Sequence, residues 1–287
     1  MTLSLLPNII VNTLVLASMY ILASLGFAFI FNMLGTINLA HGALYMLAAY
    51  VCYYLCTRFG MSNWLAMLCS VAVLIVLGVV LERFCYRPFY ASFNRIAMIS
   101  VALMTIMQTT SVLLTGSKNL KIESYAQGVS NFGPLTVSNE KLVTFAIGLV
   151  LLLVTMFIVY RTKLGMQMEA VAQDRVGAAL QGIPINKVSA IVFAFGSALA
   201  AVSGCLMGAY QQMSPYMGDN MQTRILMFVM LAGAGSMNGI IITGTIMAFL
   251  DSFFPVIYQS YVASAVSVGI IVILLLIRPK GFFGHEM

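Results

Sequence analysis

The first 57 residues of the chain contain no Asp, Glu, Lys or Arg. Arg58 is the first fully charged residue, and His41 is the only earlier side chain that gains a charge near neutral pH. A bilayer is crossed by about 20 consecutive apolar residues in a helix. The stretch is therefore predicted to form two membrane-spanning helices, separated by a break near residues 32–38.

The rest of the chain follows the same pattern. Hydrophobic residues make up 61% and charged residues only 8%, whereas a soluble domain carries about 25% charged residues. Most of the surface must therefore face lipid, and the short alternating strands typical of membrane barrels are not seen. The further apolar runs are 59–81, 96–117, 142–160, 188–218, 225–250 and 252–277. The predicted fold is an all-α integral membrane protein, a polytopic helical bundle of about eight apolar segments.

The distribution of Lys and Arg predicts an orientation, because cytoplasmic loops carry the excess of positive charge. If connections 82–95 and 161–187 and the C-terminal tail lie inside, they hold nine positive residues and the outer segments hold five, Arg224 among them. This count requires run 225–250 to dip into the membrane and return. The N-terminus is then outside and the C-terminus inside. The net charge of +6 is ordinary for membrane loops, so no nucleic-acid partner is predicted.

Glycines interrupt run 225–250 at its middle, in the sequence Gly233-Ala-Gly-Ser-Met-Asn-Gly239. Irregular backbone at membrane depth is tolerated where it is buried in protein or lines a cavity, so this segment is predicted to be broken or re-entrant. A second half-helix starting near Ser236 would present backbone N–H groups that favour an anion. The alternative is a tight helix crossing. The residues of the expected substrate path in this segment are Gly233, Gly235, Ser236, Asn238 and Gly239.

His41 lies in the sequence Ile-Asn38-Leu-Ala-His41-Gly42, at the start of the second span. An intramembrane histidine can relay protons or bind substrate, and on this hypothesis Asn38, His41 and Gly42 belong to the substrate path. The first acidic residue of the chain is Glu82, so His41 has no acidic partner close in sequence. A structural hydrogen bond that ties the Asn38 turn to a neighbouring helix is the favoured interpretation.

Small residues recur at four-residue steps in run 188–218, at Gly196, Ala200, Gly204 and Gly208. Four residues are close to one helical turn, so these positions form one stripe along a helix. A stripe of small residues lets a second helix approach closely. Tight helix packing is therefore predicted here.

Connection 161–187 carries the signals of a short cytoplasmic helix. Asp174 is a good N-cap, a helical run Arg175–Gln181 follows, and Gly182 stands where a C′ glycine belongs. We expect this loop to contact another protein; the alternative is a solvated connection between two spans. The expected contact residues are Gly165, Glu169, Ala170, Asp174, Arg175, Ala178, Ala179 and Gly182.

The chain shows no phosphate-binding loop, no zinc-protease motif and no nucleophile elbow. It is therefore predicted to be a transport subunit and not an enzyme, with no cofactor and no metal. Asp219 and Asp251 are expected near the outer ends of spans, so the midplane acids usual in coupled carriers are missing. A self-sufficient channel or secondary carrier stays as the alternative.

Several motifs resemble those of one family, the branched-chain amino acid permeases of ATP-binding-cassette importers, of the LivH type. Residues 37–42 resemble its N-(F/L)-A-H-G signature, and residues 82–88, E-R-F-C-Y-R-P, resemble its E-R-x-x-Y-R-P loop. Ser214-Pro-Tyr-Met-Gly218 and Arg278-Pro-Lys-Gly281 also stand in family order. The resemblance covers essentially the whole chain.

The resemblance implies a single permease domain over residues 1–287, in the inner membrane of a bacterium. It implies a homologous second permease subunit, two cytoplasmic ATPase subunits and an extracytoplasmic solute-binding protein as partners. Loop 161–187 matches the position of the family's coupling loop. The implied cargo is a branched-chain amino acid, and urea, short amides or another small organic solute remain open.

Overall fold

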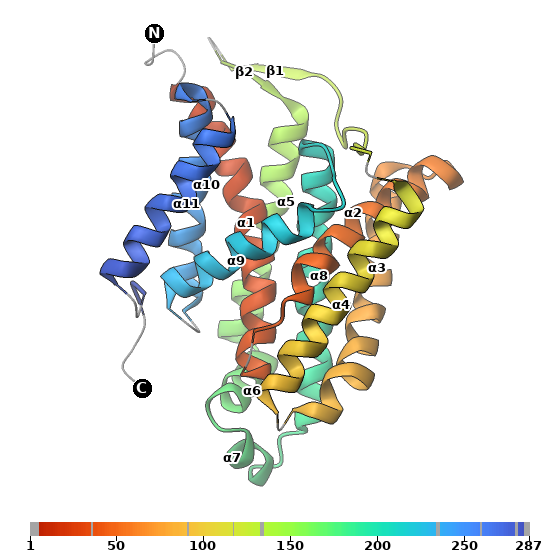
Figure 1. Ribbon diagram of the computed structural model, residues 1–287, viewed down its shortest axis with the longest axis vertical. Helices are drawn as coiled ribbons and strands as arrows, with labels where there is room; N and C mark the ends of the chain where they lie inside the picture. Colours follow the sequence, from red (N-terminus) through yellow and green to blue (C-terminus); the bar gives the residue numbers. More distant parts are fainter. Residues whose placement is uncertain are drawn as a thin grey trace.

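The computed structural model describes residues 6–35, 37–90, 92–116, 118–132, 135–233, 236–258, 260–278 and 281–283. In this part of the chain, α-helices dominate and a single two-stranded hairpin is present (Figure 1). The α-helices are α1 (Leu6–Leu34), α2 (Ala40–Phe59), α3 (Asn63–Leu81), α4 (Phe93–Thr115), α5 (Asn139–Arg161), α6 (Lys163–Gln173), α7 (Arg175–Leu180), α8 (Ile185–Tyr210), α9 (Met217–Ala232), α10 (Met237–Ile257) and α11 (Ser260–Ile277). The strands are β1 (Val129–Phe132) and β2 (Leu135–Ser138), which pair antiparallel.

The long helices run between two ends of the molecule, which we call the hairpin end and the α7 end (Figure 1). Six helices are long and apolar enough to cross a membrane, namely α1, α4, α5, α8, α10 and α3 with its extension to Phe89. The chain is therefore a polytopic helical membrane protein, as predicted. α1 starts at the hairpin end and α11 runs towards the α7 end (Figure 1), which agrees with termini on opposite sides.

α1 and α8 form the centre of the bundle. Of the 18 residues in the most apolar window of α1, 89% are buried. In the corresponding window of α8, 61% are buried. A helix that is apolar on all sides, as α1 is, belongs in the interior. In contrast, the windows of α4 and α5 are 22% and 17% buried, so these helices present most of their apolar surface outward.

The predicted stripe of small residues on α8 is a packing surface. A Cβ atom on Gly196 would lie 2.7 Å from the carbonyl oxygen of Gly26 on α1. Further along, the backbone of Tyr45 on α2 leaves no room for a side chain at Gly204. α8 therefore touches α1 and α2 backbone to backbone, which confirms the tight packing expected from the spacing.

The predicted break between the first two spans is present. α1 ends at Leu34, Gly35 adopts φ +65°, and α2 starts at Ala40. The next side chain, His41, reaches the carbonyl of Ala23 on α1. Ala23 lies about 16 Å back from the end of α1, at 1.5 Å per residue. α2 therefore begins inside the bundle and not at its surface.

Run 225–250 is interrupted as predicted, between α9 and α10. α9 runs obliquely across the middle of the molecule, away from the hairpin end, and α10 returns to the hairpin end (Figure 1). The predicted bounds were wrong, since α9 begins at Met217 and α10 continues to Ile257 through Pro255. α10 continues beyond Asp251 because the Asp251 carboxylate is paired with Arg224. The paired carboxylate does not need to reach water, so the helix does not have to end there.

Two elements were missed within the polar connections. α6 precedes α7, and Thr162 caps it by accepting a hydrogen bond from the Gly165 backbone N–H at 3.3 Å. The sequence signal was a threonine cap before the apolar spacing of Leu164, Met168 and Val171. The hairpin β1–β2 lies between the apolar runs 96–117 and 142–160, where no strand was predicted.

Candidate functional site

The start of α2 has its backbone donors satisfied inside the protein. A helix start leaves N–H groups without partners, which is costly when the start is buried. Asn38, which is 1% exposed, accepts from the Ala40 N–H at 3.1 Å through its side-chain oxygen. On α9, the Gln222 side chain accepts from the Gly42 N–H at 2.7 Å. Gln222 was not predicted as a site residue, because only the fold brings it beside Gly42.

His41 is completely buried at this helix start. Its Nε2 lies 3.0 Å from the carbonyl oxygen of Ala23, and its ring packs edge-on against Phe27 at 5.8 Å between centroids. Both partners belong to α1. His41 therefore ties the start of α2 to the neighbouring helix, in the way that the structural interpretation predicted.

The junction of α9 and α10 contains the second group of expected path residues. Gly233 ends α9 with φ +88°, and Ser236 caps α10 by accepting from the Gly239 N–H at 3.0 Å. Ser236 is half-buried and Asn238 is exposed. Gly235 lies outside the described residues. The second half-helix thus starts where the sequence predicted.

The C-terminal segment closes the other side of this junction. The backbone N–H groups of Phe282 and Phe283 donate to the carbonyl oxygens of Leu231 and Ala232 at 2.8 and 3.1 Å. These carbonyls belong to the last turn of α9, where helical partners are missing. The tail therefore caps α9, a contact that sequence reasoning did not anticipate.

The two groups of expected path residues lie at different levels of α9. Gly42 packs against Gly218 and Gln222, whereas a Cβ atom on Gly239 would lie 2.7 Å from the carbonyl oxygen of Ala232. Between Gln222 and Ala232, α9 rises about 15 Å at 1.5 Å per residue. The structure therefore joins the two groups through α9 but does not gather them into one site.

Charged side chains do lie within the helices of the bundle, contrary to the prediction for Arg224. Arg224 was assigned to an outer loop, but it lies in the middle of α9 and forms an ion pair with Asp251 of α10. The hydroxyl of Tyr20, in the middle of α1, donates to Asp251 and accepts from Arg224, both at 2.9 Å. The charges are placed there because each has its counter-charge within reach.

The predicted short helix in connection 161–187 is present as α7, at one extreme of the molecule (Figure 1). Asp174 caps it by accepting from the Val176 N–H at 2.9 Å, and Gly182 follows with φ +77°. Ala178 is buried, whereas Ala179 is exposed. The apolar surface that α7 presents outward consists of Val176 and Leu180, which are 71% and 85% exposed, together with Ala179.

The other residues expected to contact a partner are also partly buried and partly exposed. Gly165 is buried where α6 begins, because the backbone of Val159 leaves no room for a side chain. Glu169 is exposed and Ala170 is half-buried on α6. The guanidinium carbon of Arg175 lies 4.1 Å from the centre of the Tyr90 ring. Arg175 thus points back towards the bundle and not outward with Leu180.

Tyr90 connects α7 to a buried acid. Burial raises the pKa of Tyr90, and its hydrogen bond to Glu82 raises the pKa further. The phenol therefore stays protonated and donates to Glu82 Oε1 at 2.6 Å. The E-R-x-x-Y-R-P motif thus lies directly beside α7.

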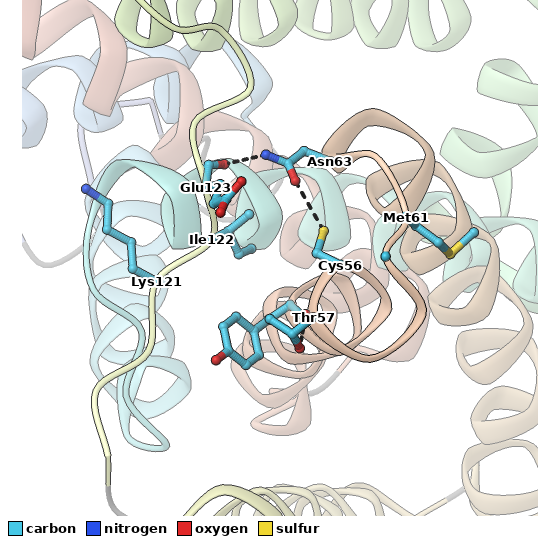
Figure 2. A pocket seen from close by; sticks show the side chains of 9 residues that line it. Cys56, Thr57, Met61, Asn63, Lys121, Ile122 and Glu123 are labelled. Carbon is cyan, nitrogen blue, oxygen red and sulfur yellow. Dashed lines mark hydrogen bonds between the residues drawn. The ribbon is translucent and has the colours of Figure 1, made fainter.

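A cavity of about 290 Å³ lies near the hairpin end, where α2 ends and α3 begins (Figure 2). Asn63 donates to the carbonyl oxygen of Glu123 at 2.8 Å and accepts from the Cys56 thiol at 3.3 Å. Lys121 and Glu123 line the cavity from the connection before the hairpin (Figure 2). None of the expected path residues lines this cavity. Asn63, the first residue of α3, holds the connection before the hairpin in place through its hydrogen bond to Glu123.

The fold and these sites define a multi-pass helical membrane protein with a broken span and an exposed helix at one end. Residues 9–277 match the family model described as the permease component of the branched-chain amino acid transport system. The chain belongs to this family. It is a transport permease and not an enzyme, and a permease component works with the other components of its transport system.

Individual relatives agree with this assignment. The chain is 30% identical to the high-affinity branched-chain amino acid transport system permease protein LivH of Escherichia coli K12, over 96% of this chain and 94% of LivH. It is 28% identical to BraD of Pseudomonas aeruginosa, a permease protein of the same kind of system, over 96% and 95% of the two chains.

The fold itself is shared with a solved structure. A chain of PsaBC from Streptococcus pneumoniae, in complex with Fab, superposes with a TM-score of 0.53 and 13% identity. The match covers 94% of this chain and 91% of that chain. At this identity the comparison concerns the fold alone.

Proposed function

We propose that the chain is the membrane-spanning permease of an ATP-driven importer of branched-chain amino acids, in the cytoplasmic membrane of a bacterium. The observation that carries the proposal is the 30% identity to LivH over 96% of the chain. The whole chain, residues 1–287, acts as one permease domain on this view. The α7 end faces the cytoplasm, in keeping with the positive residues of connections 82–95 and 161–187.

The exposed surface of α7 supports docking of an ATPase subunit. Val176 and Leu180 are apolar, exposed, and placed on a capped helix beyond the bundle. Exposed apolar groups on a short helix favour burial against a partner, and the partner in turn stabilises the helix. Two cytoplasmic ATPase subunits are the proposed partners, one on this chain and one on a homologous second permease.

The packing of the chain supports a substrate route that lies between two permease subunits. The centre of the bundle is filled by α1 and α8, and α1 is almost entirely buried. The route therefore runs along an outer face, and we place it along α9 and the α9–α10 junction. There the start of α10, with Ser236 and Asn238, favours the carboxylate of an amino acid. An extracytoplasmic binding protein delivers the solute to the hairpin end.

Reconstitution tests the proposal. The chain is co-expressed with the permease, ATPase and binding-protein genes that neighbour its own, and the purified complex is placed in lipid vesicles. We expect ATP-dependent uptake of leucine, isoleucine and valine, with no uptake of urea or acetamide. Uptake of urea or acetamide in place of leucine would reassign the cargo. Uptake without ATP would show a channel or a secondary carrier.

The docking surface has its own test. Leu180→Glu introduces a charge where α7 is expected to be desolvated by the ATPase, at a cost of about 2–5 kcal/mol. We expect loss of ATPase co-purification. Val129→Glu is the matched control, because Val129 is an exposed apolar residue on β1 at the opposite end of the molecule. Equal retention of the ATPase by both variants would exclude α7 as the docking element.

A further inference from the structure

A fully buried carboxylate lies directly after the end of α3. Glu82 is 0% exposed, and Arg87 donates to it from Nε at 3.1 Å and from Nη2 at 2.6 Å. Tyr90 donates the third hydrogen bond to the same carboxylate. A buried charge with this many partners holds them in a fixed geometry, because losing one partner leaves the charge poorly compensated.

The cluster is connected to α7 and to α8. The Arg175 guanidinium at the start of α7 stacks over the Tyr90 ring at 4.1 Å, and Arg87 Nη2 donates to the carbonyl oxygen of Asn186 at 3.1 Å. Asn186 lies in the first turn of α8. A displacement of α7 therefore reaches Tyr90 and Glu82 through direct contacts.

The same segment is connected to the start of α2. The hydroxyl of Tyr86, which is 1% exposed, donates to Asn38 Oδ1 at 2.8 Å. This oxygen also accepts from the N–H of Ala40, the first residue of α2. Because Tyr86 lies between Glu82 and Arg87 in the chain, a movement of the carboxylate cluster displaces the cap of α2.

The backbone between these contacts has an unusual form. Residues Glu82–Tyr86 form a π-helical turn that directly continues α3, followed by a 3₁₀ turn at Arg87–Phe89. A π turn contains about one residue more than an α turn, and such turns are frequent at functional sites. Return to the α form would rotate the residues that follow by about 100° in total, the angle that one residue occupies in an α-helix, which would carry Tyr86 away from Asn38. The π turn thus holds Tyr86 beside Asn38.

We propose that residues 82–90 transmit the movement of α7 to the start of α2, with Tyr86 and Tyr90 as positioning residues at the two ends of the link. The proposal rests on the proposed function, since it takes an ATPase subunit as the source of the movement. In the present structure the Tyr86–Asn38 hydrogen bond holds the cap of α2. When α7 moves, the π turn shifts, the bond breaks, and α2 is released from its contact with Gln222 of α9.

Hydrogen–deuterium exchange on the purified complex with its ATPase subunits tests this link without knowledge of the cargo. Exchange is compared with and without ATP plus vanadate. In the wild type we expect a nucleotide-dependent change at residues 175–180 and at residues 38–42. In Tyr86→Phe, the change at 175–180 persists and the change at 38–42 falls at least fivefold. Leucine uptake per ATP hydrolysed falls at least tenfold in the same variant.

Tyr54→Phe is the matched control, because the Tyr54 hydroxyl donates to a single carbonyl, that of Leu114, outside the cluster. It should leave both exchange changes intact. An unaltered change at 38–42 in Tyr86→Phe, or none in the wild type, overturns the link. Loss of ATPase co-purification in Tyr86→Phe also overturns it, since that shows a structural role only. Failure of the proposed function is distinct, because the wild-type complex would then not form or would not import leucine.

Discussion

Arg224 of α9 and Asp251 of α10 form an ion pair that joins the two arms of the broken span, and Tyr20 of α1 hydrogen-bonds both. The side chains of Arg224 and Asp251 are only 22% and 8% exposed. Asp251→Asn leaves the Arg224 charge without its counter-charge, so we expect a loss of about 3 kcal/mol in stability. Thermal unfolding in detergent measures this loss.

A double variant separates the charge from the packing. Arg224→Met combined with Asp251→Leu removes both charges and keeps similar volumes, so most of the lost stability should return. A double variant as unstable as Asp251→Asn would show that the pair is not the source of the effect.

The crossing of α2 and α9 depends on glycine. A Cβ atom on Gly218 would lie 2.7 Å from the carbonyl oxygen of Gly42, so Gly218→Ala must push the two helices apart. We expect a loss of about 1–3 kcal/mol, measured by thermal unfolding.

Gly269→Ala on α11 is the control for this crossing. Within the described part of the chain, no atom of a neighbouring element lies within 4 Å of the place that a Cβ atom on Gly269 would take. The substitution should be neutral or gain up to about 1 kcal/mol from the higher helix propensity of alanine. Equal effects of the two changes would contradict this account.

The cap of α7 should matter for docking. Asp174→Ala removes the acceptor for the Val176 N–H and costs the helix about 1 kcal/mol. Because a helix of this length is marginal alone, less ATPase should co-purify with this variant. Asp174→Ser keeps a capping oxygen and should retain the wild-type amount. If Asp174→Ala also retains it, α7 forms without its cap.

The tail contact at the end of α9 can be tested at Gly281. Gly281 has φ +77°, and a Cβ atom there would lie 2.6 Å from the backbone nitrogen of Gly233. Gly281→Val should therefore detach the tail, because both the backbone conformation and the space exclude a side chain. The amides of Phe282 and Phe283 should then exchange at least tenfold faster. Unchanged exchange would show that the tail is held by other contacts.

Local signals in the sequence were sufficient for several features. The break before α2 was predicted from the length of the charge-free stretch, the start of α10 near Ser236 from the glycines around it, and the cap of α7 from Asp174. The last two signals depend on residues within a few positions of each other. The sequence also placed the motif residues Asn38 and Tyr86, but it did not indicate that they touch.

Other features depend on residues far apart in the chain. Arg224 was assigned to a loop because a lone charge is costly in a membrane, and its partner Asp251 becomes visible only when α9 and α10 fold back on each other. Gln222 beside Gly42 and the tail beside α9 are of the same kind. Sequence spacing carries no information on such contacts until the helix packing is known.

The sequence by itself determined that this chain is a bundle of membrane helices, because apolar runs of this length have no other stable environment than lipid. It also determined the breaks before α2 and before α10, because backbone conformation there is set by neighbouring residues. The tertiary structure alone decided which buried polar groups meet. Their cost at membrane depth is removed only by partners on other helices, and helix packing decides which partners come within hydrogen-bonding distance.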